Sequence, residues 1–370
     1  MCSEKKSIAY SLVDLDFSSL DNAFESSIKS VKEIMKKYQI ACIQASIEVI
    51  DDPADKTKII SRNIERGLNV AEGSVVQENA KVIVFPEGWL QGFNHTRQLV
   101  DWKAICIQIP GPETEKIGEF TKRHQIYLAA TAFEYEPDWP NVWFATGFIV
   151  GPSGTVELRY RKIHEHNVEG LIPNVSPADV HDEYLKRYGK DSLFPVLDTP
   201  YGRLAVIIEH DINFFELSRV LTFHGAEILL HPTAEANGPM AQTHDQARRS
   251  RAYENFVYIA SANAGSIVGK YSATHASRGC TTMINYLGNV DSAIEGAGES
   301  VLVSTVDLNR LRKRRTEVFM NYPAQVKSEL FGREFSKRTF LKINTGPSTK
   351  NTAEITIKRL QEEGIFAPPE

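Results

Sequence analysis

Short apolar runs recur through the middle of the chain. They are rich in β-branched and aromatic side chains and are apolar almost throughout, as is typical of strands that are buried on both faces of a sheet. We therefore predict strands over residues 40–46, 81–87, 126–134, 143–150, 155–162, 202–211, 226–234, 256–265, 280–288 and 300–308.

Apolar positions with helical spacing lie between some of these runs. The stretch after Asn213 is an example, because Phe214, Leu217 and Leu221 recur at helical intervals and Gly225 ends the pattern. Helices are predicted over residues 55–79, 113–124, 214–225 and 243–255. Strands that alternate with helices in this way indicate an α/β fold class.

The predicted elements form one continuous region, because no change in composition divides the chain between residues 38 and 315. Residues 1–37 are polar and mixed, with a weakly amphipathic stretch over 23–37. Residues 316–370 carry basic and proline-rich pieces and a short helix predicted over 352–363. We expect a single domain over 38–315, flanked by an N-terminal arm and a C-terminal arm that pack on it or on another subunit.

Composition narrows the class of protein. The chain has 370 residues, 42% of them hydrophobic and 24% charged, which is typical of a globular protein. Its net charge of −5 gives no reason to expect nucleic acid or a membrane as partner. The four cysteines are widely spaced, so neither a disulfide framework nor a thiolate zinc site is indicated. With no apolar leader or membrane-length run in the sequence, we expect a cytoplasmic protein.

Ionisable side chains follow three of the predicted strands. Glu87 ends KVIVFPE, Lys162 ends TVELRYRK, and Glu209 interrupts the apolar run GRLAVII. A carboxylate is costly to bury at such a place unless a charge or a hydrogen-bond donor pairs with it. Ligand sites of α/β proteins form at the carboxyl ends of strands. We therefore predict that these three residues share one site.

The stretches around these residues resemble the nitrilase superfamily of carbon–nitrogen hydrolases. VFPEGWLQGF, GPSGTVELRYRKIH, YGRLAVIIEHDINFFELSRVLTFHGAEILLHPTAE and RAYENFVYIASANAG follow one another in the family's order. The length of the chain and the insertion at 170–200 are similar to the amidase branch. The resemblance implies a four-layer αββα sandwich, no cofactor or metal, a small-molecule substrate, and assembly into homodimers or larger homo-oligomers.

The resemblance also implies roles for individual residues. The family hydrolyses amides, nitriles or carbamoyl groups with a Glu–Lys–Cys triad, in which Glu87 matches the general base and Lys162 the lysine that steadies the oxyanion. Glu169 is the expected second glutamate, with Glu165 as the alternative because the spacing is one residue shorter than in the amidases. The nucleophilic cysteine belongs in an I-C-x-D pattern. This chain has Glu209 in that position, within Ile208-Glu209-His210-Asp211.

A carboxylate does not replace a thiolate as a nucleophile toward an amide, because the product is an unstable anhydride. We therefore expect no ordinary amidase or nitrilase turnover. In one hypothesis Glu209 acts with Glu87 as general acid and base, or anchors a cationic substrate, so that the protein works on an amide-, nitrile- or amine-bearing molecule. In the other, Glu209 forms an ion pair with Lys162 and the protein is an inactive binding or assembly module. Replacement of a natural cysteine is a third explanation.

Further residues are expected around the site. Trp89, two residues past Glu87, is a candidate for the wall of an apolar pocket. His210, Ala234 and Glu235 are expected to border the substrate. Histidines at 164 and 166 together with the carboxylates raise the question of a metal site, but we expect none because the resembling family uses no metal.

Overall fold

A computed structural model describes residues 37–94, 96–140, 142–165, 174–238, 241–270, 277–337, 341–346 and 352–367. Residues 1–36, which make up nearly all of the predicted N-terminal arm, lie outside the described residues. Glu169 and His166 lie outside them as well.

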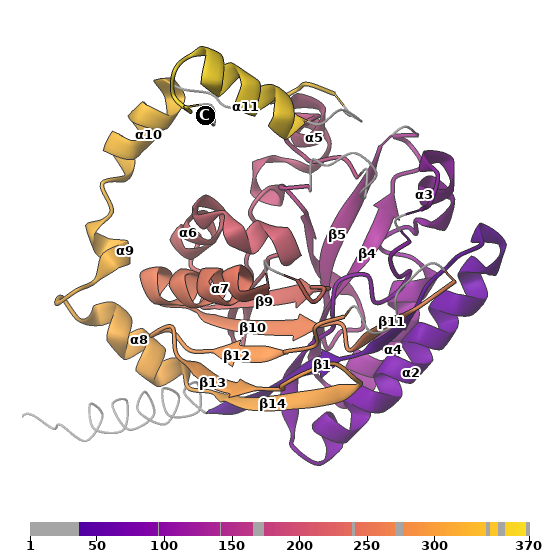
Figure 1. Cartoon of the computed structure of the whole chain (residues 1–370). Helices are drawn as coiled ribbons and strands as arrows, with labels where there is room; N and C mark the ends of the chain where they lie inside the picture. Colours follow the sequence, from indigo (N-terminus) through magenta and orange to yellow (C-terminus); the bar gives the residue numbers. More distant parts are fainter. Residues whose placement is uncertain are drawn as a thin grey trace, which may run out of the picture. The chain divides into compact units, whose positions relative to one another are not determined.

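Two six-stranded mixed sheets form the centre of the domain (Figure 1). In the first sheet the strand order is β14 (Ser300–Val306), β1 (Tyr38–Gln44), β3 (Ala80–Val84), β4 (Tyr127–Tyr135), β5 (Trp143–Val150) and β6 (Val156–Arg161). In the second it is β13 (Val290–Ala293), β12 (Thr282–Ile284), β10 (Tyr258–Asn263), β9 (Ile228–Thr233), β8 (Gly202–Val206) and β7 (Leu197–Thr199). A small pair, β2 (Ser46–Glu48) with β11 (Ser266–Val268), lies apart from both.

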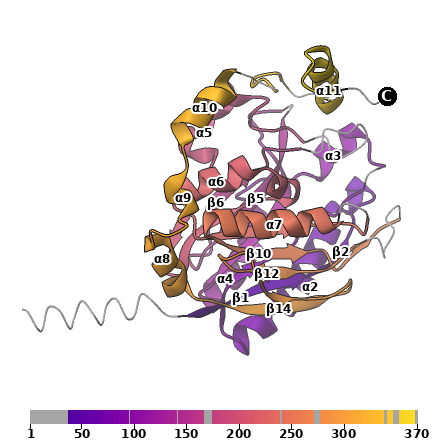
Figure 2. The same ribbon diagram turned by 60° about the vertical axis from the view of Figure 1, so that its left-hand side comes forward.

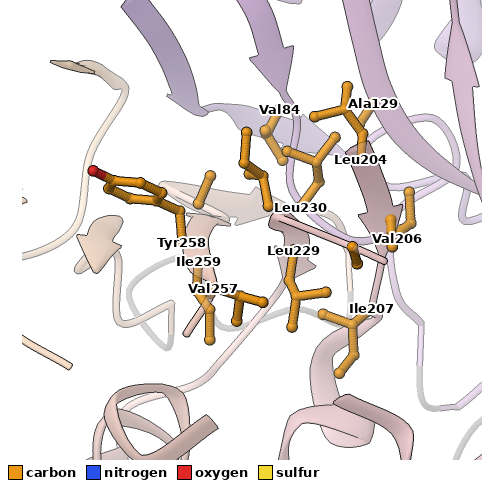
Figure 3. Close-up of a cluster of buried hydrophobic side chains, with 14 of the residues drawn as sticks. Val84, Ala129, Leu204, Val206, Ile207, Leu229, Leu230, Val257, Tyr258 and Ile259 are labelled. Atoms are coloured by element: carbon orange, nitrogen blue, oxygen red, sulfur yellow. The ribbon is translucent and has the colours of Figure 1, made fainter. Parts of the chain in front are cut away.

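The main apolar core lies between the two sheets. Val84 and Ala129 of the first sheet belong to the same buried cluster as Leu204, Val206 and Leu230 of the second (Figure 3). Burial of these side chains from both sheets explains why the strands are apolar along nearly their whole length.

Helices cover the outer faces of both sheets (Figures 1 and 2). On the first sheet, α2 (Lys56–Val76) and α4 (Pro112–His124) contribute Ile60, Ile64 and Ile117 to a second buried cluster. On the other sheet, α6 (Phe215–Phe223) and α7 (Ala241–Asn255) pack through Leu217, Leu221 and Ala252. The order of layers is helix, sheet, sheet, helix, so the predicted four-layer αββα sandwich is confirmed.

The remaining helices lie outside these layers. They are α3 (Leu99–Ile105), α5 (His181–Tyr188), α8 (Leu308–Thr316), α9 (Tyr322–Gln325), α10 (Ser328–Lys337) and α11 (Thr352–Glu362). The helix predicted over 352–363 is thus present, whereas the sequence does not predict α3, α5, α9 or α10. Among the described helices, none is long and apolar enough to span a lipid bilayer.

Each of the ten predicted strands is present, but three end well before the predicted residue: β3 at Val84, β8 at Val206 and β12 at Ile284. The run 202–211 was expected to be strand throughout, whereas β8 ends at Val206 and a short 3₁₀ helix covers Glu209–Asn213. The prediction of 202–211 was wrong there because the apolar residues Ile207 and Ile208 stay buried beyond the last residue of β8.

Arg161, the last residue of β6, fixes the end of that strand. Its guanidinium donates to both carboxylate oxygens of Glu134, at 2.8 and 2.9 Å. It also lies over the rings of Phe144, Tyr184 and Tyr188, with its central carbon 4.1 Å from the Tyr188 ring centre. A planar, always charged guanidinium suits both kinds of contact. The chain therefore leaves β6 at a rigid point, immediately before Lys162.

Candidate active site

The structure brings Glu87, Lys162 and Glu209 together. The ammonium nitrogen of Lys162 lies 2.9 Å from Glu87 Oε1 and 3.2 Å from Glu209 Oε2. The three residues are 5%, 3% and 7% exposed, respectively. One lysine is therefore shared by two nearly buried carboxylates that come from different sheets.

Glu87 lies on a tight turn that bridges the two sheets. Its backbone N–H donates to the carbonyl of Thr233 in the second sheet, at 3.2 Å, and Gly88 N–H donates to Thr131 Oγ1 in the first, at 3.0 Å. Gly88 has a φ of +69°, and a Cβ there would lie 2.4 Å from the Phe93 ring. Only glycine satisfies both the left-handed backbone and the close packing of this turn.

Lys162 follows β6 directly, and its backbone N–H donates to Ala145 O at 2.9 Å. Burial by itself lowers the pKa of this lysine, but the charges of Glu87 and then Glu209 outweigh burial and raise the pKa above its ordinary value. Lys162 is therefore a permanent ammonium at neutral pH. It supplies fixed positive charge and does not act as a base.

Glu209 stands at a sharp turn after the second sheet. Its φ is +37°, in a region that residues other than glycine seldom occupy. Such a backbone costs on the order of 1–3 kcal/mol, and strained residues of this kind cluster at functional sites. The turn places the side chain at the Lys162 ammonium instead of leaving it along the strand.

Asp211 joins the segment that carries Lys162 to the segment that carries Glu209. Its Oδ1 accepts from the backbone N–H of His164 at 2.9 Å and lies 2.8 Å from His164 Nδ1. Its Oδ2 accepts from the Tyr160 hydroxyl at 2.6 Å. His164 in turn stacks on Phe214, with ring centres 3.6 Å apart. The sequence raised His164 as a candidate metal ligand, whereas in the structure it ties two strand ends together.

Glu235, expected to border the substrate, is held in an ionic network. Arg248, Arg278 and His244 lie at its carboxylate, and Asp245 binds both arginines. Burial alone would raise the pKa of Glu235, but these partners, the His244 hydrogen bond first, lower it below its usual range. Neither arginine is predicted at the site from the sequence. Arg248 lies in the run RRSRA, which is equally typical of a solvated helix face, whereas Arg278 lies in no comparable basic run.

The other residues expected at the site lie in different surroundings. Trp89 is fully buried, stacks on Phe85 and donates its indole N–H to Asn63 O, so its ring belongs to the core and offers no exposed surface to a ligand. His210 and Ala234 are partly exposed, next to Glu209 and Glu235 in the chain.

Glu165, the alternative to Glu169, lies three residues after Lys162. Burial, followed by the charge of Asp179, raises its pKa to about 7. Its Oε2 is buried without a hydrogen-bond partner among the described residues. Since Glu169 lies outside those residues, the choice of second glutamate remains a prediction. In the described part of the chain, no cluster of three or more His, Cys, Asp or Glu is arranged to hold a metal ion.

Comparison with known proteins identifies the family. Residues 39–316 match the family model described as carbon–nitrogen hydrolase. Human omega-amidase NIT2 is 28% identical over 304 residues, covering 82% of this chain and 100% of its own. The zebrafish (Danio rerio) omega-amidase NIT2 is 27% identical over 285 residues, covering 77% of this chain and 93% of its own.

Solved structures share the fold. Saccharomyces cerevisiae Nit3, a nitrilase-superfamily member, aligns with a TM-score of 0.61 at 19% identity, covering 79% of this chain and 98% of its own. The Caenorhabditis elegans NitFhit protein aligns with a TM-score of 0.62 at 20% identity, covering 80% of this chain and 66% of its own. The Glu87–Lys162–Glu209 cluster thus lies within the fold and the matched region of a known family, and the chain belongs to the carbon–nitrogen hydrolase family of the nitrilase superfamily.

Proposed function

We propose that this protein acts on a small amide-, nitrile- or amine-bearing molecule by proton transfer, with no thiol intermediate. Glu87 and Glu209 serve as base and acid, and Lys162 is the fixed charge between them. The observation that carries this proposal is the sharing of one ammonium by two buried carboxylates, at 2.9 and 3.2 Å.

The charge balance of the cluster supports proton chemistry. Among these three side chains, Lys162 neutralises one of the two carboxylates and leaves the charge of the other in excess. Carboxylates crowded in this way compete for a proton, so one of them holds it more tightly than the other. A poised acid beside a poised base is the arrangement that activates water or moves a proton on a bound substrate.

The same balance favours one kind of ligand. Both carboxylates already face the Lys162 ammonium, and Asp211 adds its negative charge to the field at this lysine. An anionic ligand would meet this excess of negative charge, whereas a cationic amine, amidine or guanidine would be attracted to it. The substrate class is therefore a neutral or cationic nitrogen compound.

The short distance between Glu209 and Lys162 also favours a second function, that of a binding module without catalysis. Glu209 lies 3.2 Å from Lys162, and both residues are almost fully buried, as in a structural ion pair. Removing one partner of such a pair is costly, so the pair persists without any catalysis. In this case the protein is an inactive family member that binds a ligand or a partner.

One comparison decides between the two functions. Wild type, Glu87→Gln, Glu209→Gln and the control Glu216→Gln, which changes an exposed residue of α6, are incubated with small-molecule extract and followed by mass spectrometry. A compound consumed by wild type and the control, but by neither site variant, supports proton chemistry. Unchanged consumption by Glu209→Gln overturns the role of Glu209. Consumption by none of the four proteins favours the binding module.

Homo-oligomer formation belongs to the same proposal. Phe215 and Phe223 of α6 are exposed, and Leu330, Phe331 and Phe335 of α10 present further apolar surface. Apolar side chains gathered on one element mark contact surfaces more often than scattered ones do. We expect light scattering to give at least a dimer for wild type and a smaller species for the Phe215→Glu, Phe223→Glu double variant. A double variant of unchanged mass excludes α6 as the contact.

A further inference from the structure

His231 contacts the main chain of the strained turn at Glu209 from within the second sheet. It is on β9, is fully buried, and is the register partner of Ser261 on the neighbouring parallel strand β10. Its Nδ1 lies 2.9 Å from Ser261 Oγ. Its Nε2 lies 3.1 Å from the backbone carbonyl oxygen of Glu209. The imidazole therefore spans from the core of the second sheet to the main chain of the candidate site.

These contacts fix the tautomer of the ring. A carbonyl oxygen only accepts hydrogen bonds, so Nε2 carries the proton and donates it to Glu209 O. Nδ1 then accepts from the Ser261 hydroxyl. Burial, and after it the charge of Arg248, lowers the pKa of His231 to about 4, so the ring is neutral at physiological pH. His231 thus gives the site an oriented donor and adds no charge.

The Glu209 carbonyl accepts this hydrogen bond at the start of the short 3₁₀ helix Glu209–Asn213. Strand pairing of the chain stops just before the turn, where Ile207 N–H donates to Leu230 O. Beyond that point the backbone of Glu209 adopts its left-handed conformation, with a φ of +37°. A strained φ persists only where the surroundings hold it. The His231 hydrogen bond to the Glu209 carbonyl is a direct restraint on this strained backbone.

We infer that His231 is a positioning residue of the site, which holds the left-handed backbone of Glu209 so that the carboxylate stays at Lys162, and that Ser261 orients the ring for this task. Any effect on turnover rests on the proposed function. The effect on the geometry at position 209 does not, so it can be measured without knowledge of the substrate.

The test uses a thiol as a probe of that geometry. In the background Glu209→Cys, the rate at which iodoacetamide alkylates the new thiol is measured against pH, with the modified peptide quantified by mass spectrometry. The variants His231→Leu and His231→Gln are added to this background. Leucine fills the space without a donor, whereas the glutamine amide reaches a position similar to Nε2 and restores one.

A nearby ammonium such as that of Lys162 favours the reactive thiolate form of a thiol. Without the hydrogen bond from His231, the turn relaxes and the thiol moves away from this ammonium. We expect His231→Leu to slow alkylation at neutral pH by about tenfold to a hundredfold and to move the pH profile to higher pH. His231→Gln should restore most of the rate. An unchanged rate and profile in a folded His231→Leu protein would overturn the inference, because a purely structural core histidine predicts that result.

Ser261→Ala provides the second variant if the leucine protein does not fold. It leaves the imidazole in place but removes the hydroxyl that donates to Nδ1 and orients the ring. We therefore expect alkylation to slow by only several-fold. An alkylation rate equal to that of Glu209→Cys alone overturns the inference. The outcomes also separate the two claims. If the alkylation rate depends on His231 but wild type turns over no substrate, only the proposed function is refuted. If turnover depends on Glu209 but the alkylation rate does not depend on His231, only this inference is refuted.

Discussion

Gly147 of β5 lies directly against Val206 of β8, so closely that a Cβ at position 147 would come within 2.5 Å of Val206 Cγ1. This contact joins the two sheets next to the candidate site. β5 pairs with β6, which leads into Lys162, and β8 leads into Glu209. The absence of a side chain at Gly147 therefore sets how near these two strand ends come to each other.

Gly147→Ala should separate the sheets at this point. We expect the free energy of unfolding to fall by about 1–3 kcal/mol, as is usual when a methyl group is forced into a packed core. Gly73→Ala is the matched control, because Gly73 lies in α2 with nothing within 4 Å of the added Cβ. The control should gain about 0.5–1 kcal/mol from helix propensity. Urea unfolding of the two variants measures both changes, and equal stabilities would contradict the close approach.

Glu209→Cys should introduce thiol chemistry. The left-handed turn, Glu87 and Lys162 are all in place, so a thiol at this position meets a base and an oxyanion partner. We expect hydrolysis of simple amides that wild type does not catalyse, with an acyl-enzyme visible by mass spectrometry. Two controls should stay inactive: Glu209→Ser, and the double variant that combines Glu209→Cys with Glu87→Gln. A thiol that alkylates readily but never forms an acyl-enzyme would show that substrate access is missing.

Lys162→Met should destabilise the protein strongly. Two carboxylates would remain buried without their cation, at a cost of about 3–5 kcal/mol at neutral pH. The loss should shrink as the pH falls, because the folded variant binds protons on those carboxylates more tightly than the unfolded chain does. Chemical unfolding at several pH values measures this trend. Adding Glu209→Gln to Lys162→Met should recover part of the lost stability. If the loss of stability depends neither on pH nor on the residue at 209, Lys162 is not the shared cation of the two carboxylates.

In wild type, the contribution of Lys162 to the free energy of unfolding is lost at high pH rather than at low pH. Its raised pKa means that its stabilising contribution is complete below the unfolded pKa, near 10.4, and is lost only as the pH rises beyond that value. The difference between wild type and Lys162→Met should therefore be largest between neutral and weakly alkaline pH.

Glu165→Gln should stabilise the protein above neutral pH. The pKa of Glu165 is raised from 4.5 to about 7, so wild type loses stability as the pH rises through this window. Below pH 4.5 the glutamine and the protonated acid are equivalent, and above pH 7 the gain should reach a constant value of no more than about 3 kcal/mol. Glu216→Gln on α6 should show no such trend. A pH-independent difference for Glu165→Gln would mean that its carboxyl titrates normally.

The apolar runs predicted the strands well because burial on both faces leaves a continuous signal in the chain. The turn at Glu209 left no such signal, since Ile207 and Ile208 stay buried beyond the last residue of β8. The position of Glu87, Lys162 and Glu209 after predicted strands indicated that they converge, and the family resemblance supplied their expected roles. Contacts such as Arg278 with Glu235 or His231 with Glu209 join segments that are distant in sequence, and no local pattern records them.

Trp89 illustrates a different limit. A tryptophan beside a candidate catalytic residue is as typical of a core as of a pocket wall. Its burial depends on Gly67 of α2, where a Cβ would lie 2.6 Å from the indole nitrogen. A glycine more than twenty residues earlier thus makes room for the ring, and this relationship is visible only in three dimensions.

The antiparallel pairing of β1 with β14 has a consequence for how the protein is made. Tyr38 pairs with Val306 and Gln44 with Ser300, so the first sheet is completed by the last strand of the domain. At about 5–20 residues per second, the ribosome takes roughly 10–50 s to synthesise the chain between these two strands. During that time β1 has an open edge, which is a template for pairing with other chains. The nascent protein should therefore depend on chaperones until β14 emerges.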